Sequence, residues 1–154
     1  MVTTVAIGVD GSETAAIALD MGVEVARRFD AKVVLLSAIR ASKTTRSSSS
    51  IATAGLATAG LAIDPIELDW AYEKAARVRH VLESTEARLR RAGLDCMTMF
   101  DEGDAGEVLV RLAEECNADL LVVGSKGMQR RVLGSVPNTV THKAPCSVLV
   151  VKTT

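Results

Sequence analysis

Five short apolar runs alternate with longer helical patterns along this chain, and no other feature constrains the fold as strongly. Runs without a polar alternation are typical of strands that are buried on both faces. Strands that alternate with helices predict an α/β sandwich with a parallel sheet and right-handed crossovers. A length of 154 residues suits one such domain, residues 1–154. The predicted strands cover residues 5–9, 31–39, 94–100, 120–123 and 147–151.

Helix-start signals precede the segments between these strands. Ser12 is a suitable N-cap, and the helix after it is expected to bury Ala16, Leu19, Val23 and Ala26 on one face. The predicted helices cover residues 13–29, 65–92, 105–116 and 135–143.

The second of these helices has the strongest start. Asp64 can cap it, Pro65 suits its first position, and Glu67 can close a capping box. Trp70 and Tyr72 in its first turns are expected to pack rather than to form a ligand cage. The next strand is less apolar and is expected near a sheet edge, before a turn at residues 101–104.

Composition excludes several classes of function. Aromatic residues make up only 3% of the chain, so the stacking platforms of single-strand nucleic-acid binders are nearly absent. The net charge is −1, which disfavours a nucleic-acid partner or an anionic membrane surface. We expect neither a nucleic-acid nor a membrane partner.

Cysteine usage indicates a reducing compartment. Cys96, Cys116 and Cys146 are far apart and form no CxxC pair. The N-terminus has no evident signal peptide, and no apolar run approaches the roughly 20 residues of a spanning helix. A cytoplasmic location is therefore expected.

A stretch rich in Ser, Ala and Gly covers about residues 40–63. Its composition predicts a flexible loop, longer than ordinary connections. It is either a flap over a site or a tolerated insertion, and the sequence leaves both interpretations open.

Two turns that are far apart in the sequence are candidates for one site. Asp10 follows the first strand and Gly124 ends the fourth. In open parallel sheets, ligands bind beyond the carboxyl ends of the strands, where the strand order reverses. If these two strands flank that point, both turns lie at its mouth. The Asp10 carboxylate suits a ribose hydroxyl, a base amine or a water-bridged metal, and the backbone at Ala38 can meet an adenine edge.

The segment after the fourth strand is rich in glycine and positive charge. Gly124 and Gly127 allow the backbone to approach a ribose and phosphates, and Gly134 and Ser135 open a helix whose N-terminus attracts anions. Further contacts with phosphates can come from Val136, Lys126, Arg130 and Arg131.

Other nucleotide and metal motifs are missing. The chain has no GxxxxGK[ST] after its first strand and no GxGxxG there. His80 and His142 lack the spacing of a zinc site. No catalytic residue is assigned.

Three segments together resemble the universal stress protein family over nearly the whole chain. They are residues 9–12, residues 118–127 and residues 133–151. The resemblance implies a five-stranded parallel sheet in the order 3-2-1-4-5, the adenine nucleotide alpha hydrolase-like fold. It also implies a cytoplasmic homodimer joined through the last strand, Ser147–Val151. The exposed edge of an apolar strand independently favours such pairing.

The family's ATP-binding branch carries G-x2-G-x9-G-[ST], which Gly124, Gly127, Gly134 and Ser135 match at its fixed positions. By resemblance, the adenosine part would be held by Asp10 and the main chain at Val9 and Ala38. The ribose and phosphates would be held by Gly124, Gly127, Gly134, Ser135 and Val136.

The spacing within this motif departs from the family. Only six residues, 128–133, separate Gly127 from Gly134, where the family has nine. The expected ligand is ATP or another adenine nucleotide, with Mg²⁺ as an accompanying ion, and the shorter loop leaves AMP or another nucleotide with fewer phosphates open. Two alternatives stay open: an interaction protein that binds no nucleotide, and a slow ATP hydrolase or self-phosphorylating protein with Ser135 as acceptor.

Overall fold

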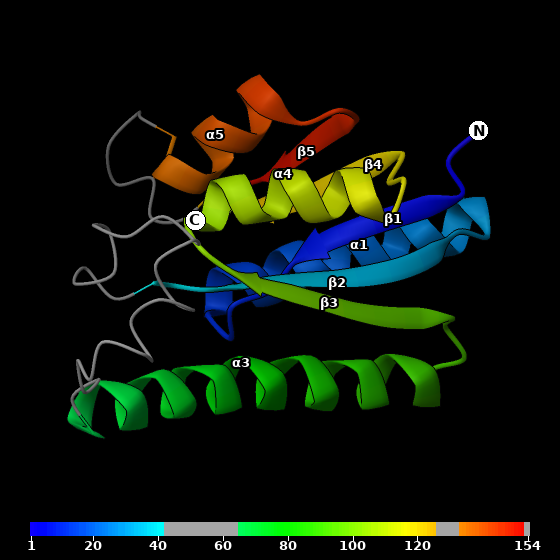
Figure 1. Cartoon of the computed structure of the whole chain (residues 1–154). Coiled ribbons are helices and arrows are strands. Elements are labelled where there is room, and N and C mark those ends of the chain that lie inside the picture. Colours follow the sequence, from blue (N-terminus) through cyan, green and yellow to red (C-terminus); the bar gives the residue numbers. More distant parts are fainter. Residues whose placement is uncertain (42–64, 126–132, 153–154) are drawn as a thin grey trace.

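The chain folds around one parallel sheet with its strands in the order β3-β2-β1-β4-β5, as the sequence predicts (Figure 1). The computed structural model describes residues 1–41, 65–125 and 133–152. The strands are β1 (Thr4–Gly8), β2 (Lys32–Ile39), β3 (Cys96–Glu102), β4 (Leu120–Gly124) and β5 (Ser147–Val151). The helices are α1 (Glu13–Phe29), α3 (Pro65–Arg91), α4 (Ala105–Glu115) and α5 (Ser135–Lys143).

Two apolar layers hold the helices to the sheet. Side chains alternate between the faces of a strand, so Val5 and Ile7 of β1 point to one layer and Ala6 to the other. The first layer packs against α1 and α3, and the second packs against α4 and α5. Both faces of the sheet are therefore covered at its centre, which explains the continuous apolar runs of β1, β2 and β4.

The first helix begins where the sequence predicts, but its buried face is slightly rotated. The Ser12 hydroxyl accepts a hydrogen bond from the Ala15 amide at 3.2 Å. Ala16, expected inside, is exposed, and Val23 is only half-buried. The close approach of Gly22 to the side chain of Ile7 sets this rotation, because a β-carbon there would lie 2.6 Å from Ile7 Cδ1. The buried residues of α1 are Ala15, Ala18, Leu19, Gly22 and Ala26.

Two expectations about the middle of the chain are wrong. Asp101 and Glu102 do not form a turn but extend β3, because they pair with Ala38 and Ile39 of β2. Trp70 and Tyr72 do not pack: they are 63% and 69% exposed.

The exposure of these aromatic residues follows from the length of α3. A helix of 27 residues is about 40 Å long, whereas a strand of 7 residues spans about 23 Å. The start of α3 therefore projects beyond the sheet (Figure 1).

Parts of the predicted loop and of the capping box cannot be compared with the structure. Residues 42–63 of the loop and the cap at Asp64 lie outside the described residues, as does the side chain of Glu67. Asp104 caps α4, since its carboxylate accepts hydrogen bonds from the amides of Gly106 and Glu107.

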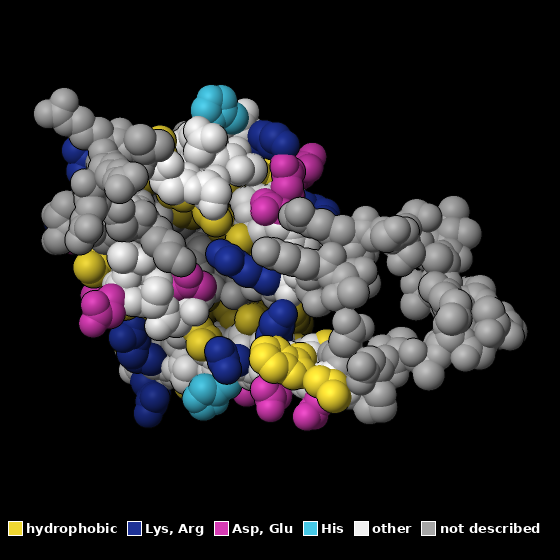
Figure 2. Space-filling model, turned by 90° about the vertical axis from the view of Figure 1, so that its left-hand side faces the viewer, with side chains coloured by type: hydrophobic (Ala, Val, Ile, Leu, Met, Phe, Trp, Pro, Cys, Tyr) yellow, Lys and Arg dark blue, Asp and Glu magenta, His cyan; other side chains and the backbone are white. Residues whose placement is uncertain are grey.

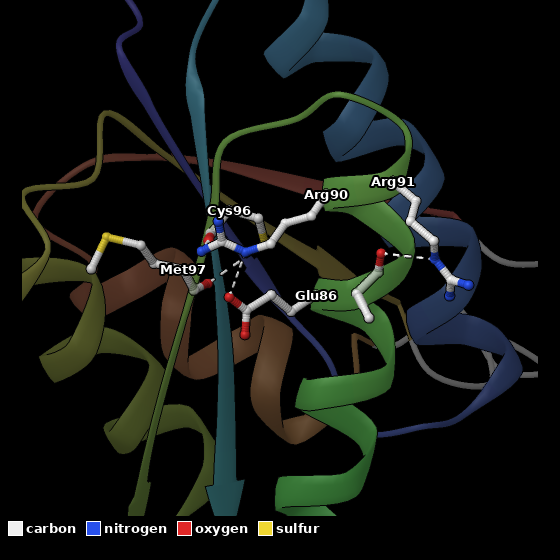
Figure 3. Close-up of polar contacts among 6 residues, drawn as sticks. Glu86, Arg90, Arg91, Cys96 and Met97 are labelled. Atoms are coloured by element: carbon white, nitrogen blue, oxygen red, sulfur yellow. Dashed lines mark hydrogen bonds and ion pairs between the residues drawn. The ribbon is translucent and has the colours of Figure 1, made fainter.

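Arg90 joins the end of α3 to the edge strand β3 (Figure 3). Its Nε donates to Glu86 Oε1 at 2.8 Å, and its Nη2 donates to the carbonyl oxygen of Cys96 at 2.7 Å. One guanidinium thus fixes the helix to the first residue of the strand.

The three cysteines are free, and Cys96 is buried. None of the helices in the described part of the chain is both long and apolar enough to cross a membrane.

Candidate functional site

A cavity of about 220 Å³ lies beyond the carboxyl ends of β1, β2 and β4. In the sheet, β1 lies between β2 and β4. From β2 the chain continues outward to β3, and from β4 it continues outward on the other side to β5, so the strand order reverses at β1. This is the point at which open α/β sheets bind ligands. Figure 2 shows this end of the molecule, where acidic and basic side chains surround the hollowed centre of the face.

The β1–α1 turn supplies the acidic wall of the cavity. Asp10 Oδ1 accepts hydrogen bonds from the Ser12 amide at 2.9 Å and from the Ser12 hydroxyl at 2.5 Å. The same hydroxyl caps α1, so the carboxylate and the helix start are fixed together. Asp10 is exposed, and its other oxygen accepts no hydrogen bond from another described residue.

The end of β4 forms the floor beside this turn. Gly124 lines the cavity, and its backbone packs against the first turn of α1. The next residue, Ser125, is fully buried, and its amide donates to the carbonyl oxygen of Val151 at 2.9 Å. The chain therefore leaves β4 along a fixed direction.

The N-terminus of α5 forms the wall opposite α1. Gly134 is its N-cap, with a φ of −60°, and supplies no side-chain hydrogen bond to the first turn. Pro137 has no amide hydrogen, so the first turn presents the amides of Ser135 and Val136. These amides and the helix dipole favour an anion at this place.

The remaining wall comes from β2 and α4 and is largely apolar. Leu36 and Ala38 of β2 and Leu109 of α4 line it, with Arg40 at its outer end. The complete described lining consists of Gly8, Val9, Asp10, Ser12, Thr14, Ala15, Leu36, Ser37, Ala38, Arg40, Ala105, Leu109, Val123, Gly124, Gly134, Ser135, Val136 and Pro137.

Most of the residues singled out from the sequence meet in this cavity. Val9, Asp10, Ala38, Gly124, Gly134, Ser135 and Val136 all line it. Lys126, Gly127, Arg130 and Arg131 lie outside the described residues. The geometry thus brings together every predicted site residue that the structure describes.

Sequence reasoning missed the α4 wall and Arg40. Ala105 and Leu109 belong to a helix that carries no glycine or charge motif, so only the three-dimensional packing reveals them. Arg40 adjoins the low-complexity stretch and was grouped with it. Its position two residues after Ala38 was the available signal, because alternate residues of a strand share a face.

The described residues do not form a metal centre. They contain no group of three or more His, Cys, Asp or Glu side chains close enough to hold an ion. Asp10 is the one carboxylate in the described lining of the cavity.

Comparison with known proteins agrees with the fold. The model of the universal stress protein family matches residues 1–152. Universal stress protein Rv1636 of Mycobacterium tuberculosis is 33% identical over 155 residues, covering 98% of this chain and 97% of the relative.

Solved structures share the architecture. Universal stress protein UspA from Lactobacillus plantarum has a TM-score of 0.74 at 22% identity, covering 97% of each chain. A universal stress protein solved in complex with cAMP has a TM-score of 0.70 at 29% identity and covers 99% of each chain. By its family match, its relatives and its fold, the chain belongs to the universal stress protein family.

Proposed function

We propose that this universal stress protein is a stress-response module that binds an adenine nucleotide in the cavity between β1, β2, β4 and α5. One observation carries the proposal: a carboxylate, an apolar slot and an uncapped helix N-terminus line the same cavity. They suit a ribose, a base and a phosphate in that order. The related universal stress protein in complex with cAMP, 29% identical, adds support for this ligand class.

The size of the cavity favours a nucleotide with one phosphate. Its volume of about 220 Å³ lies below the ~300–1,000 Å³ usual for ligand pockets. AMP or cAMP suits it better than ATP, in line with the short spacing between Gly127 and Gly134. If Mg²⁺ accompanies the phosphates, Asp10 is the carboxylate that the described lining offers it.

Calorimetric titration with AMP, cAMP, ATP and GMP, with and without Mg²⁺, tests the proposal on the full chain. We expect AMP and cAMP to bind more tightly than ATP, and GMP to bind weakly. Asp10→Asn should weaken binding about tenfold or more, because it removes a charged hydrogen-bond acceptor. Glu13→Gln is the matched control, since Glu13 is exposed nearby but does not line the cavity. A folded protein that binds none of these ligands would contradict the proposal.

The hydrolase alternative has less support. A general base must reach the water or hydroxyl that it activates, and Asp10, whose Oδ1 is held by Ser12, is the one candidate in the described lining. No second carboxylate lines the described part of the cavity.

We further propose that two copies pair through β5, in the cytoplasm. β5 is an edge strand, hydrogen-bonded to β4 on one side only. Unpaired apolar edges invite a partner strand. Light scattering coupled to size exclusion tests the pairing, and a monomer mass at all concentrations would contradict it.

The free cysteines suit the cytoplasm, where thiols stay reduced.

A further inference from the structure

We propose that the planar guanidinium of Arg40 stacks on the base of the bound nucleotide. This stacking makes the cavity prefer ligands that carry a planar base. The inference rests on the proposed nucleotide function and deepens it, because it names how the base is held. It assigns a role to a residue that carries no motif of its own.

The two ends of the cavity differ in chemistry. The end at β2 and α4 is apolar, whereas the end at β4 and α5 has a helix N-terminus and the Ser135 hydroxyl. A nucleotide has the same asymmetry, with an apolar base at one end and an anionic phosphate at the other. Since α4 packs on β2 and α5 packs on β4, the base belongs at β2 and the phosphate at α5. The apolar end is formed by Leu36, Ala38, Ala105 and Leu109.

Arg40 lies at the apolar end, next to the expected base. Leu36, Ser37 and Ala38 near the end of β2 line the cavity, and so does Arg40, the first residue after the strand. Ile39, which lies between the last two, does not line it. Arg40 therefore extends the wall that Leu36 and Ala38 begin.

The guanidinium of Arg40 is available for a ligand. Arg40 is exposed, and it has no hydrogen bond or ion pair with another described residue. It is the one cation in the described lining, and the one carboxylate there, Asp10, is engaged by Ser12. A planar, weakly hydrated guanidinium stacks well on aromatic rings and on nucleobases.

The arrangement separates stacking on the base from contact with the phosphate. The N-terminus of α5, which suits the phosphate, lies on the far side of β1 from Arg40. A stacking residue contributes equally to a nucleoside and to its phosphate ester. A residue that contacts the phosphate contributes only to the ester.

Calorimetric titration of the full chain with adenosine and with AMP tests the inference. The variants are Arg40→Ala and Arg40→Lys, with Arg27→Ala as control, since Arg27 is exposed at the other end of the sheet. We expect Arg40→Ala to weaken the binding of adenosine and the binding of AMP by the same factor, about 3- to 30-fold. Arg40→Lys keeps the positive charge but lacks the planar guanidinium. Its affinities for adenosine and AMP should therefore lie nearer to those of Arg40→Ala than to those of wild type. Melting temperatures should be unchanged, because Arg40 has no hydrogen bond or ion pair with any described residue.

The outcomes separate this inference from the function on which it rests. If wild type binds both ligands and Arg40→Ala changes neither affinity, the inference fails and the proposed function stands. It also fails if only AMP is weakened, if wild type binds AMP but not adenosine, or if Arg27→Ala weakens binding equally. If wild type binds neither adenosine nor AMP, the inference and the proposed function fail together.

Discussion

A β-carbon placed on Gly124 lies 2.8 Å from the carbonyl oxygen of Thr14. Gly124 ends β4 and Thr14 belongs to the first turn of α1, so strand and helix backbones meet here without room for a side chain. Gly124 is not among the glycines with a positive φ. The close approach of two backbones therefore requires a glycine at this position, whatever the ligand does.

Gly124→Ala should destabilise the fold. The added methyl group must displace backbone rather than a mobile side chain, and we expect the free energy of unfolding to fall by about 1–3 kcal/mol. Urea denaturation measures this. Gly134→Ala is the control, because a φ of −60° suits any residue, and it should cost less than about 1 kcal/mol. Equal stability of the two variants would contradict the packing explanation.

Asp119 should make stability depend on pH. The Thr3 amide, the Thr3 hydroxyl and the Thr4 amide donate to its carboxylate and lower the pKa of Asp119. A carboxylate with a lowered folded-state pKa stabilises the fold above its ordinary pKa of about 3.9. That contribution disappears as the pH falls through the folded-state pKa.

Asp119→Asn should therefore lower the melting temperature at neutral pH. The difference from wild type should begin to shrink as the pH falls below about 4, where the carboxylate of the unfolded state protonates, and should vanish once the pH is also below the lowered folded-state pKa. Thermal melts across this range measure it. Glu114→Gln, at an exposed residue of α4, should show no such trend. A difference that is constant with pH would exclude the carboxylate charge as its cause.

Arg90→Met should loosen the contact between α3 and β3. The variant keeps an unbranched apolar stem but loses the guanidinium and with it the bonds to Glu86 and to the Cys96 carbonyl oxygen. Arg91→Met is the control, because Arg91 donates only within its own helix, to the Ala87 carbonyl oxygen at 3.2 Å (Figure 3). We expect a lower melting temperature for Arg90→Met than for Arg91→Met. The reverse order would show that the bridge to β3 contributes little.

The three cysteines should differ in reactivity. Burial raises the pKa of the Cys96 thiol to about 11, and the residue has no exposed surface. Cys116 and Cys146 are half-buried, with pKa values raised less strongly by burial. At about pH 8, iodoacetamide should label Cys96 at least about tenfold more slowly than the other two, as read by mass spectrometry. Similar rates in native protein would contradict this, whereas in denaturant all three should react alike.

The helices and the place of the cavity are predicted because they depend on local chemistry and on common topology, whereas the strand order is implied by the resemblance to the family. Ser12 and Asp104 are caps by residue type, and the two turns at Asp10 and Gly124 follow from where apolar runs stop. Their meeting at one cavity follows from the parallel sheet.

What the sequence did not predict depends on contacts between distant elements. Trp70 and Tyr72 are apolar enough to expect burial, but only the length of α3 against the sheet shows that they project beyond it and are exposed. Gly124 was interpreted as a ligand contact, and only the position of Thr14 shows its packing role. The place of Arg40 in the cavity is evident only from the structure, where it continues the wall formed by Leu36 and Ala38.

The pairing of β1 with β4 joins the first and second parts of the chain, since Val5 lies beside Leu120. Such a distant pairing closes the longest loop of the fold and is expected to form slowly. The cavity lies on this seam, with the Asp10 turn on one side and α5 on the other. A partly folded chain with only β1–β3 or only β4–β5 would therefore hold half a binding site, and binding competence should appear at the same step as complete folding.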